Sequence, residues 1–335
     1  MDVSEIGEFG LIGRLASILG REAPADLIVG IGDDAAVWRA GDQYVIATTD
    51  TMVEGVHFVA DAASWADIGW KALAVNVSDI GAMGGEPLFA LVTLALPPDT
   101  AVDDMDALYR GLNGCAAEYG VAIAGGDIVS APQVSVTVAL MGRAQVAGGE
   151  PLLLLRSGAK AGDAIAVSGT LGASAAGLRR LREGGQSSDR LVRAHMRPSP
   201  PLSLGQEAAR GGLRCGIDVS DGLLQDIGHI CEMSGLGALV RADAVPTSPD
   251  LTFAYPQDAL RLACAGGEDY ELVLVGDRER IERAGAGSGI PVTIIGEMIE
   301  GGERRARLLD GEGSEINLGS PGWDHLRGTA FERRA

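Results

Sequence analysis

Lysine is almost absent from this sequence. Of the 27 basic residues among its 335 positions, only Lys71 and Lys160 are lysines. Neither completes the Gly-Lys-Ser/Thr end of a P-loop, because Lys71 follows a tryptophan and Lys160 follows an alanine. Neither lies in a Val-Ala-Ile-Lys strand, and no His-Arg-Asp occurs, so the protein-kinase signature is also missing. Two familiar routes to phosphate binding are therefore excluded.

Positive charge is scarce as a whole. The 27 basic residues face 46 acidic ones, which gives a formal net charge of −19. Such a balance argues against nucleic acid as a general partner, since phosphate contacts need a basic surface. It also disfavours an anionic membrane surface. An acidic protein can still bind phosphorylated ligands if metal cations lie between the charges.

Aromatic residues, cysteines and long apolar runs are few as well. Aromatics make up 4% of a chain that is 46% hydrophobic and 22% charged, as in a soluble globular protein with an aliphatic core. The four cysteines show no CxxC spacing and are expected to be buried thiols of a reducing compartment. No basic start followed by an apolar stretch, and no run of about 18 apolar residues, occurs. We expect a cytoplasmic protein.

Common hydrolase motifs are missing too. The four histidines form no HExxH pair, and no GxSxG elbow is present, so zinc and serine hydrolases are disfavoured. A glycine-rich turn at 168–176 leads into a helix and could hold an anion. It faintly resembles the phosphate loop of GHMP small-molecule kinases, although an ordinary strand–turn–helix is the favoured interpretation.

The chain alternates strand and helix patterns in both halves. Its length suggests two domains, and the glycine-rich stretch 147–151 is the expected linker. The pattern favours an α/β or α+β fold. The predicted strands are 43–49, 88–96, 121–124, 134–141, 164–168 and 213–219, with further apolar runs at 271–275 and 292–295. The predicted helices are 64–83, opened by a capping box at Ser64, then 103–119, one from about 173, and 222–234.

Acidic residues lie at or near the ends of several predicted strands, and two more follow the Gly-Ile-Gly turn at 30–32. They are Asp33, Asp34, Asp50, Asp127, Asp218 and Asp221. Each by itself fits ordinary turn chemistry, because aspartate favours turns and helix N-termini. Their repetition favours a shared site, since ligands of open α/β sheets bind beyond the carboxyl ends of the strands. Clustered carboxylates and hydroxyls suit Mg²⁺ that is shared with substrate phosphates.

Asp79 is an acidic residue on the apolar stripe of a predicted helix. Ile68, Ala72, Val75 and Asp79 follow a 4-3-4 spacing and share one stripe of the predicted 64–83 helix. A carboxylate on a core-facing stripe must be paired or metal-bound. We favour metal ligation over a structural ion pair, because Lys71 on the same helix is more than two turns away.

A series of motifs resembles thiamine-monophosphate kinase in order along nearly the whole chain. They are Gly30–Val37, Thr48–Thr51, Glu54–Phe58, Gly69–Asp79, Gly125–Asp127, Arg156–Lys160, Ile217–Leu223, Gly266–Leu272 and Gly322–His325. The Glu-Gly-Val-His-Phe and Gly-Gly-Glu-Asp-Tyr-Glu-Leu blocks are the most specific. The wider superfamily of aminoimidazole ribonucleotide synthetase and selenophosphate synthetase shares the fold but not these blocks.

The resemblance implies transfer of the ATP γ-phosphoryl group to thiamine monophosphate, giving thiamine diphosphate. It implies an α/β (α+β) fold with an N-terminal domain at 1–147 and a C-terminal domain at 148–335, and a homodimer whose N-terminal sheets pack together. By motif, several Mg²⁺ ions would be held by Asp34, Thr48, Thr49, Asp50, Asp79, Asp127, Asp218 and Asp221. ATP would contact Tyr109, Gly126, Asp127, Arg156 and Ser220, and thiamine monophosphate would contact His57, Glu268 and Trp323.

Three departures affect the nucleotide loops. Ile128 replaces a usual threonine, Ala173 replaces a frequent aspartate, and 145–151 looks like a short insertion. The resemblance nevertheless agrees with the charge, because metal ions would let an acidic protein bind two anions. A phosphate acceptor is already an oxyanion near neutral pH, so no catalytic base is assigned.

Three other functions stay open at this point. A GHMP-like kinase would phosphorylate an alcohol, using the 168–176 turn and a catalytic acid or lysine beside the acceptor hydroxyl. An ATP-dependent synthetase or cyclase of the wider superfamily would release ADP and phosphate. An acidic structural protein would bind Mg²⁺ without turning over ATP.

Overall fold

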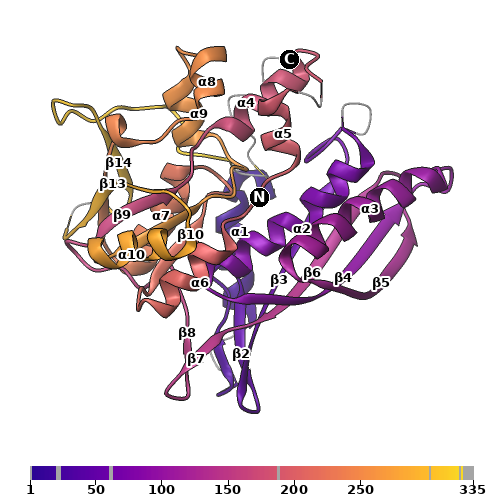
Figure 1. Cartoon of the computed structure of the whole chain (residues 1–335), viewed down its shortest axis with the longest axis horizontal. Coiled ribbons are helices and arrows are strands. Elements are labelled where there is room, and N and C mark those ends of the chain that lie inside the picture. The colour runs from indigo at the N-terminus through magenta and orange to yellow at the C-terminus, as the bar shows by residue number, and fades with distance from the viewer. Residues whose placement is uncertain are drawn as a thin grey trace.

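The chain forms two six-stranded sheets, each covered by helices (Figure 1). The computed structural model describes residues 2–19, 24–59, 63–186, 189–301, 303–323 and 326. The mixed α/β architecture that the sequence predicted is confirmed. Within the described residues, no helix is both long and apolar enough to cross a membrane. All four cysteines are buried and unbridged, as expected.

The first sheet is built from residues before 144. Its strands, in spatial order, are β1 (Leu27–Val29), β2 (Ala36–Ala40), β3 (Gln43–Val53), β6 (Ser135–Arg143), β4 (Glu86–Leu96) and β5 (Ala122–Ser130). Neighbouring strands are antiparallel except β4 and β5, which are parallel. Alternation along β6 places Val136, Val138 and Leu140 on a buried face, so one face of the sheet carries the core.

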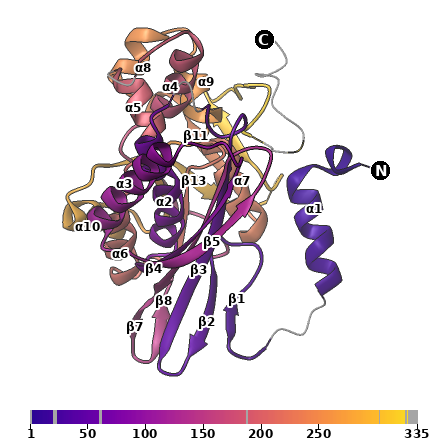
Figure 2. The same cartoon turned by 90° about the vertical axis from the view of Figure 1, so that its right-hand side faces the viewer.

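Helices α2 (Trp65–Ala82) and α3 (Val102–Tyr119) cover that buried face (Figure 2). Ser64 caps α2 by accepting from the Asp67 amide at 3.1 Å, as the sequence predicted. The two helices approach so closely that a Cβ on Gly69 would lie 1.9 Å from the Leu108 carbonyl oxygen. A third helix, α1 (Val3–Leu19), lies on the other side of the sheet in Figure 2 and buries only Gly7.

A hairpin replaces the expected linker. Strands β7 (Gln145–Ala147) and β8 (Glu150–Leu152) pair with each other and project from the molecule in Figure 1. Gly148 and Gly149 have φ of 64° and 89°, and two successive positive φ angles are what a tight two-residue hairpin turn requires. The apparent insertion at 145–151 is therefore most of a hairpin. The domain division at 147/148 falls within it and stays a prediction.

The second sheet is built from residues after 163. Its spatial order is β10 (Cys215–Asp218), β12 (Leu272–Gly276), β9 (Ala164–Ser168), β13 (Val292–Ile299), β11 (Gly237–Arg241) and β14 (Ala306–Leu309). Its helices are α4 (Ala173–Arg182), α5 (Arg190–Met196), α6 (Leu202–Arg210), α7 (Leu223–Ser234), α8 (Pro249–Ala254), α9 (Ala259–Ala265) and α10 (Arg278–Ser288), with a short 3₁₀ turn η1 (Ala242–Ala244).

Helix α2 lies at the junction of the two halves. It packs on β3 and β6 of the first sheet and on α6 and β10 of the second half. Consequently α2 is buried almost all round rather than along a single stripe. Two polar side chains of this helix, Lys71 and Ser78, contact Glu268 and Asp218 of the second half.

Two predicted strand ends are wrong. β3 continues past Asp50 to Val53, and β5 continues past Asp127 to Ser130. The sequence 48–51 is rich in β-branched threonine, and β6 offers partners along its full length, so pairing carries on through Asp50. Strand β4 likewise pairs with β5 through Asp127 as far as Ser130. Because most pairs are antiparallel, the acidic residues do not gather at one carboxyl edge of a parallel sheet. Asp34 and Asp218 meet Asp79 across the junction instead, whereas Asp127 stays on the exposed strand β5.

Candidate active site

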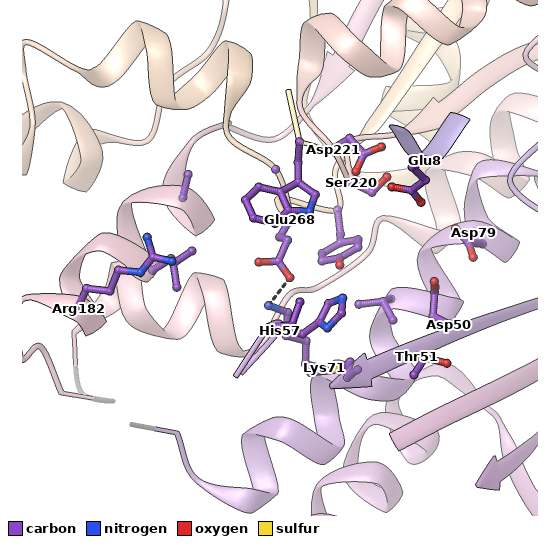
Figure 3. Close-up of a pocket in the computed structure, with 18 residues that line it drawn as sticks. Glu8, Asp50, Thr51, His57, Lys71, Asp79, Arg182, Ser220, Asp221 and Glu268 are labelled. Carbon is purple, nitrogen blue, oxygen red and sulfur yellow. Dashed lines mark ion pairs between the residues drawn. The ribbon is translucent and has the colours of Figure 1, made fainter. Parts of the chain in front are cut away.

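A cavity of about 310 Å³ opens between the two halves of the protein (Figure 3). Seven residues that the sequence analysis assigned to metal, ATP or acceptor binding line it. They are Asp50, His57, Asp79, Ser220, Asp221, Glu268 and Trp323. The remaining lining residues are Glu8, Thr51, Met52, Val56, Lys71, Val75, Ala175, Leu178, Arg182, Gly267 and Tyr270. Elements far apart in the sequence thus build one pocket.

Three carboxylates converge beside this pocket. One oxygen each of Asp34, Asp79 and Asp218 lies within 4.8 Å of the others. Asp34 precedes β2, Asp79 is on α2, and Asp218 ends β10, so the cluster joins both sheets through the junction helix. This clustering agrees with the prediction that these residues act together.

Hydroxyl and guanidinium groups hold the three carboxylates in place. Thr48 Oγ1 donates to Asp79 Oδ2 at 2.5 Å, and Ser78 Oγ donates to Asp218 Oδ2 at 2.5 Å. Arg156 forms an ion pair with Asp34 through Nη2. The other oxygen, Asp34 Oδ2, is buried and has no hydrogen-bond partner.

Burial and mutual repulsion raise the pKa of these acids. Burial, followed by the charges of Asp50, Asp218 and Asp34, raises the pKa of Asp79 well above its usual value. Burial and the charge of Asp34 raise the pKa of Asp218 to about 8. Three carboxylates this close do not share a buried site as anions unless a cation compensates them.

The cluster fits a divalent cation. Its donors are hard oxygens from carboxylates and hydroxyls, which is the ligand chemistry of Mg²⁺. The unpartnered, buried Asp34 Oδ2 is an acceptor that such an ion would satisfy. Asp50 lines the adjoining cavity and raises the pKa of Asp79, which places its charge beside the same cluster.

Thr49 has a different contact. Its hydroxyl donates to the Val138 carbonyl of the neighbouring strand at 3.1 Å. Thr48, one residue earlier, is bonded to Asp79 instead. Alternation along β3 therefore directs these two predicted ligands to different surroundings.

Ser220 and Asp221 lie on the loop between β10 and α7. Gln225 Nε2 donates to Asp221 Oδ2 at 3.2 Å. The Asp221 carboxylate also lies with Asp226 and His229 in a second group whose ligand atoms are within 4.8 Å. The sequence analysis missed Asp226 and His229, although their positions on α7, one turn apart, could have drawn attention to them.

The residues assigned to the acceptor line the same cavity. Trp323 reaches it because its amide donates to the Asp221 carbonyl at 3.1 Å and its own carbonyl accepts from Gln225 Nε2 at 2.5 Å. His57 lies on the turn after β3, where its Nδ1 accepts from the Val53 amide at 3.1 Å. The next two residues of the Trp323 motif, Asp324 and His325, lie outside the described residues.

Lys71 has a partner that the sequence analysis did not identify. It does not pair with Asp79; its Nζ lies 2.7 Å from Glu268 Oε1. Lys71 is 1% exposed, and His195 Nδ1 lies 3.5 Å from the other Glu268 oxygen. The separation from Asp79 along α2 is real, but folding brings a carboxylate from position 268 to the lysine. The spacing of Lys71, Val75 and Asp79 by four residues could have placed Lys71 in the site.

Three residues assigned to ATP lie away from the cavity. Tyr109 is on α3, and Gly126 and Asp127 are on β5, which is exposed along nearly all its length. The register places Asp127 in one cross-strand row with Thr51, three strands away, or about 14 Å at ordinary strand spacing. The roles of these three residues stay predictions. Ile128, the neighbouring departure, is exposed on the same strand.

The glycine-rich turn at 168–176 is already occupied by a carboxylate. Asp269 accepts from the Gly172 amide at 2.6 Å and from the Ser174 amide at 3.0 Å. These are the amides at the N-terminus of α4 that a phosphate would need. Ala173, the other departure, is the first residue of this helix. The turn is therefore a capped helix start, and a GHMP-like use of it is not supported.

Family models match both halves of the chain. Residues 32–144 match the model of AIR synthase related protein, N-terminal domain, and residues 160–308 match that of the C-terminal domain. The thiamine-monophosphate kinase of Escherichia coli (strain K12) is 38% identical over 341 residues, covering 96% of this chain and 98% of that protein. The Bacillus subtilis (strain 168) enzyme is 36% identical, covering 96% and 99%. The chain belongs to the thiamine-monophosphate kinase family.

Solved structures agree with this family assignment. AaThiL complexed with AMPPCP and TMP has a TM-score of 0.85 and 31% identity, covering 97% of this chain and 99% of that one. Hydrogenase maturation protein HypE in complex with ATP has a TM-score of 0.67 at 18% identity, covering 93% and 91%, which shows a shared fold alone. The predicted fold and family are thus confirmed.

Proposed function

We propose that this protein transfers the γ-phosphoryl group of ATP to the phosphate of thiamine monophosphate, giving thiamine diphosphate. The observation that carries this proposal is a single pocket lined by His57, Glu268 and Trp323 together with Asp79, which belongs to the adjoining carboxylate cluster. Relatives at 36–38% identity over nearly the full chain are thiamine-monophosphate kinases, which supports the same reaction here.

Mg²⁺ is the proposed metal. Asp34, Asp79 and Asp218 would hold it, with Asp50 and Asp221 nearby. When bound, Mg²⁺ would neutralise phosphate charge, which is most of what phosphoryl transfer requires of an enzyme. Thr48 and Ser78 orient two of the carboxylates, and Arg156 is the cation beside them that could contact a nucleotide phosphate.

The acceptor end of the pocket, defined here as Val56, His57, Glu268 and Trp323, would receive the thiamine rings. Trp323 offers an aromatic face to the thiazolium cation, and such contacts contribute about 0.5–2 kcal/mol. No general base is needed, because the phosphate of the acceptor is already ionised near neutral pH. The protein's work is therefore to bind, orient and screen charge.

A product assay tests the reaction. Incubation with ATP, Mg²⁺ and thiamine monophosphate should yield thiamine diphosphate and ADP in equal amounts. Thiamine should be a very poor acceptor, since its hydroxyl would need a base that the site does not supply. Comparable turnover of thiamine would contradict the mechanism, and release of free phosphate without thiamine diphosphate would favour a synthetase instead.

We also propose that the protein is a homodimer. On the face of the first sheet that α2 and α3 leave uncovered, Phe89 and Leu91 are 52% and 42% exposed, and Val129 on β5 shares this face. A second copy covering it would bury this apolar surface. Asp127 belongs to the same face, so a partner could bring it to the other copy's pocket.

Mixing two inactive variants tests this arrangement. Asp79→Asn and Asp127→Asn should each be inactive alone. After the subunits are exchanged, half the dimers would be mixed with one intact site each, so about a quarter of wild-type activity should return. Native mass spectrometry shows whether mixed dimers have formed. If they have formed and no activity returns, Asp127 acts in the site of its own chain or lies outside the site.

A further inference from the structure

Burying the charged Lys71 side chain inside the protein is energetically unfavourable. Lys71 is 1% exposed on α2, the most buried helix of the first half. A buried ammonium must be compensated, and replacing a buried ion pair by apolar side chains of similar volume is often neutral or stabilising. We therefore expect the ion pair with Glu268, 2.7 Å away, to contribute little to the stability of the fold. Its location in the pocket wall suggests another purpose (Figure 3).

Glu268 is held in an unfavourable backbone conformation. Its φ is 66°, in the left-handed region that residues with a side chain seldom adopt, and Tyr270 has a φ of 52°. The Glu268 amide donates to the Ser220 carbonyl at 2.7 Å, and the Tyr270 amide donates to the Val219 carbonyl at 2.9 Å. Strain of this kind persists where surrounding contacts enforce it, often in ligand sites.

The carboxylate of Glu268 is fixed from two further directions. Lys71 contacts Oε1, and His195 Nδ1 lies 3.5 Å from Oε2. His195 also contacts Ser174 Oγ at 3.0 Å and is 2% exposed, so its ring is itself immobilised. Backbone, ammonium and imidazole together leave the Glu268 side chain, which is 28% exposed, facing the cavity in one orientation.

We propose that Lys71 is a positioning residue for acceptor recognition, whose buried ammonium keeps Glu268 charged and oriented at the acceptor end of the pocket. This inference rests on the proposed function, because it assigns Glu268 to the thiamine part of the acceptor. Lys71 acts through Glu268 and not on the transferred phosphoryl group. Removing its charge should therefore weaken acceptor binding and spare ATP.

The charges around Glu268 indicate how the effect would appear with pH. Burial raises the pKa of Glu268, but its surroundings, the charge of Lys71 first among them, lower it to about 2. His195 and His57 are the other titratable groups near it. Burial and the charge of Lys71 lower the pKa of His195 to about 3, so His195 is neutral and Lys71 supplies the contacting charge. Without the ammonium, burial would dominate and Glu268 would take up a proton at a higher pH.

The test compares four proteins: wild type, Lys71→Met, Glu268→Gln and the double variant. Michaelis constants for thiamine monophosphate and ATP are measured at about pH 6 and about pH 8. Because the acceptor phosphate also titrates near pH 6, each variant is expressed as a ratio to wild type at the same pH. Lys160→Met, which removes the other and exposed lysine, is the matched control and should resemble wild type.

We expect Lys71→Met to raise the acceptor KM about tenfold or more, as for loss of a charge-assisted contact, with ATP KM nearly unchanged. The increase should be larger at about pH 6 than at about pH 8, and this pH dependence should vanish in the double variant. If Lys71→Met fails to fold, the double variant decides: an acceptor KM equal to that of Glu268→Gln, with normal ATP KM, supports the proposal.

A structural role would give a different pattern. In that case Lys71→Met would melt at a lower temperature while its KM for thiamine monophosphate stays near the wild-type value. That result, or a near-wild-type KM for thiamine monophosphate in the double variant, would overturn the proposal. An equal rise in the KM for thiamine monophosphate and in the KM for ATP would also overturn the proposal. Wild-type protein that forms no thiamine diphosphate would contradict the proposed function, and the acceptor role of Lys71 with it.

Discussion

At the scale of single residues, the site depends on charges that are costly to bury. Asp34, Asp79 and Asp218 converge from three elements, and burial raises the pKa of each. In contrast, the nearby ion pair lowers the pKa of Glu268 to about 2 despite its burial. The carboxylates beside the cavity are therefore hard to ionise by themselves, whereas the Glu268 anion is compensated by the protein.

Asp79→Asn should separate binding from folding. The change keeps the size of the side chain but removes one charge from the cluster, so Mg²⁺ should bind more weakly and kcat should fall by orders of magnitude. In metal-free buffer the variant should melt at the same temperature as wild type or higher, because repulsion with Asp50 and Asp218 is relieved. Mg²⁺ titrations and thermal melts check this.

Asp42→Asn is the control for this substitution, since Asp42 is exposed on the turn between β2 and β3. It should change neither property. A lower melting temperature for Asp79→Asn without metal, with unchanged Mg²⁺ dependence of activity, would contradict metal ligation at this position.

Trp323→Ala should weaken binding of thiamine monophosphate and leave ATP binding unchanged. Losing one aromatic–cation contact is worth about 1–2 kcal/mol, or roughly a 5–30-fold rise in the KM for thiamine monophosphate. ATP affinity should stay nearly constant, because the side chain lines the acceptor end of the cavity. Steady-state kinetics measures both constants. A general loss of folding, without a selective change in KM, would instead mean that Trp323 serves packing.

At the scale of elements, α2 decides where the functional side chains point. Lys71 faces the second half of the protein, Asp79 faces the cluster, and Ser78 bonds Asp218 across the junction. One helix thus supplies groups to both ends of the pocket. Because Lys71 and Asp79 lie on one buried helix, its geometry sets the spacing between the two groups.

Helix α4 depends on a distant cap. Asp269→Ala should remove the acceptor for the Gly172 and Ser174 amides and destabilise the protein by about 0.5–2 kcal/mol, the usual cost of losing a helix cap. Urea unfolding measures this loss. Because the turn is not a phosphate site in the proposed function, ATP KM should change little. A large, selective rise in ATP KM with normal stability would revive a nucleotide role for the turn.

At the scale of the whole molecule, the acidic cluster links stability to pH and metal. The pKa of Asp218 rises from 3.8 to about 8 and that of Asp33 to about 7 on folding, mainly through burial. The folded protein then binds more protons than the unfolded chain between about pH 4 and pH 8. Stability from these groups is therefore present below about pH 4 and is lost as pH rises toward 8.

Melting temperature should accordingly fall between about pH 5.5 and pH 8 in metal-free buffer, and Mg²⁺ should reduce that fall by compensating the ionised carboxylates. Calorimetry over this pH range, with and without Mg²⁺, measures how steeply the melting temperature falls with pH in each case. Asp218→Asn should flatten the metal-free slope. Identical slopes in wild type and this variant would show that Asp218 does not titrate in this range.

The sequence by itself determined the architecture and the family, and it supplied candidate residues for the site. Helix α2 with its Ser64 cap follows from local patterns, and the ordered motifs identify the family. These features are local, so spacing and composition record them. Helical spacing made Asp79 a candidate, and the motif resemblance made His57 and Trp323 candidates, but neither gave their contacts.

Only the tertiary structure decided which groups meet. It paired Lys71 with Glu268, 197 positions later (268 − 71), where the sequence offered only Asp79 on the same helix. It extended β3 through Asp50, and it filled the 168–176 turn with Asp269. Each outcome depends on partners from remote segments, and burial at the junction of the two halves determines which charges must be compensated there.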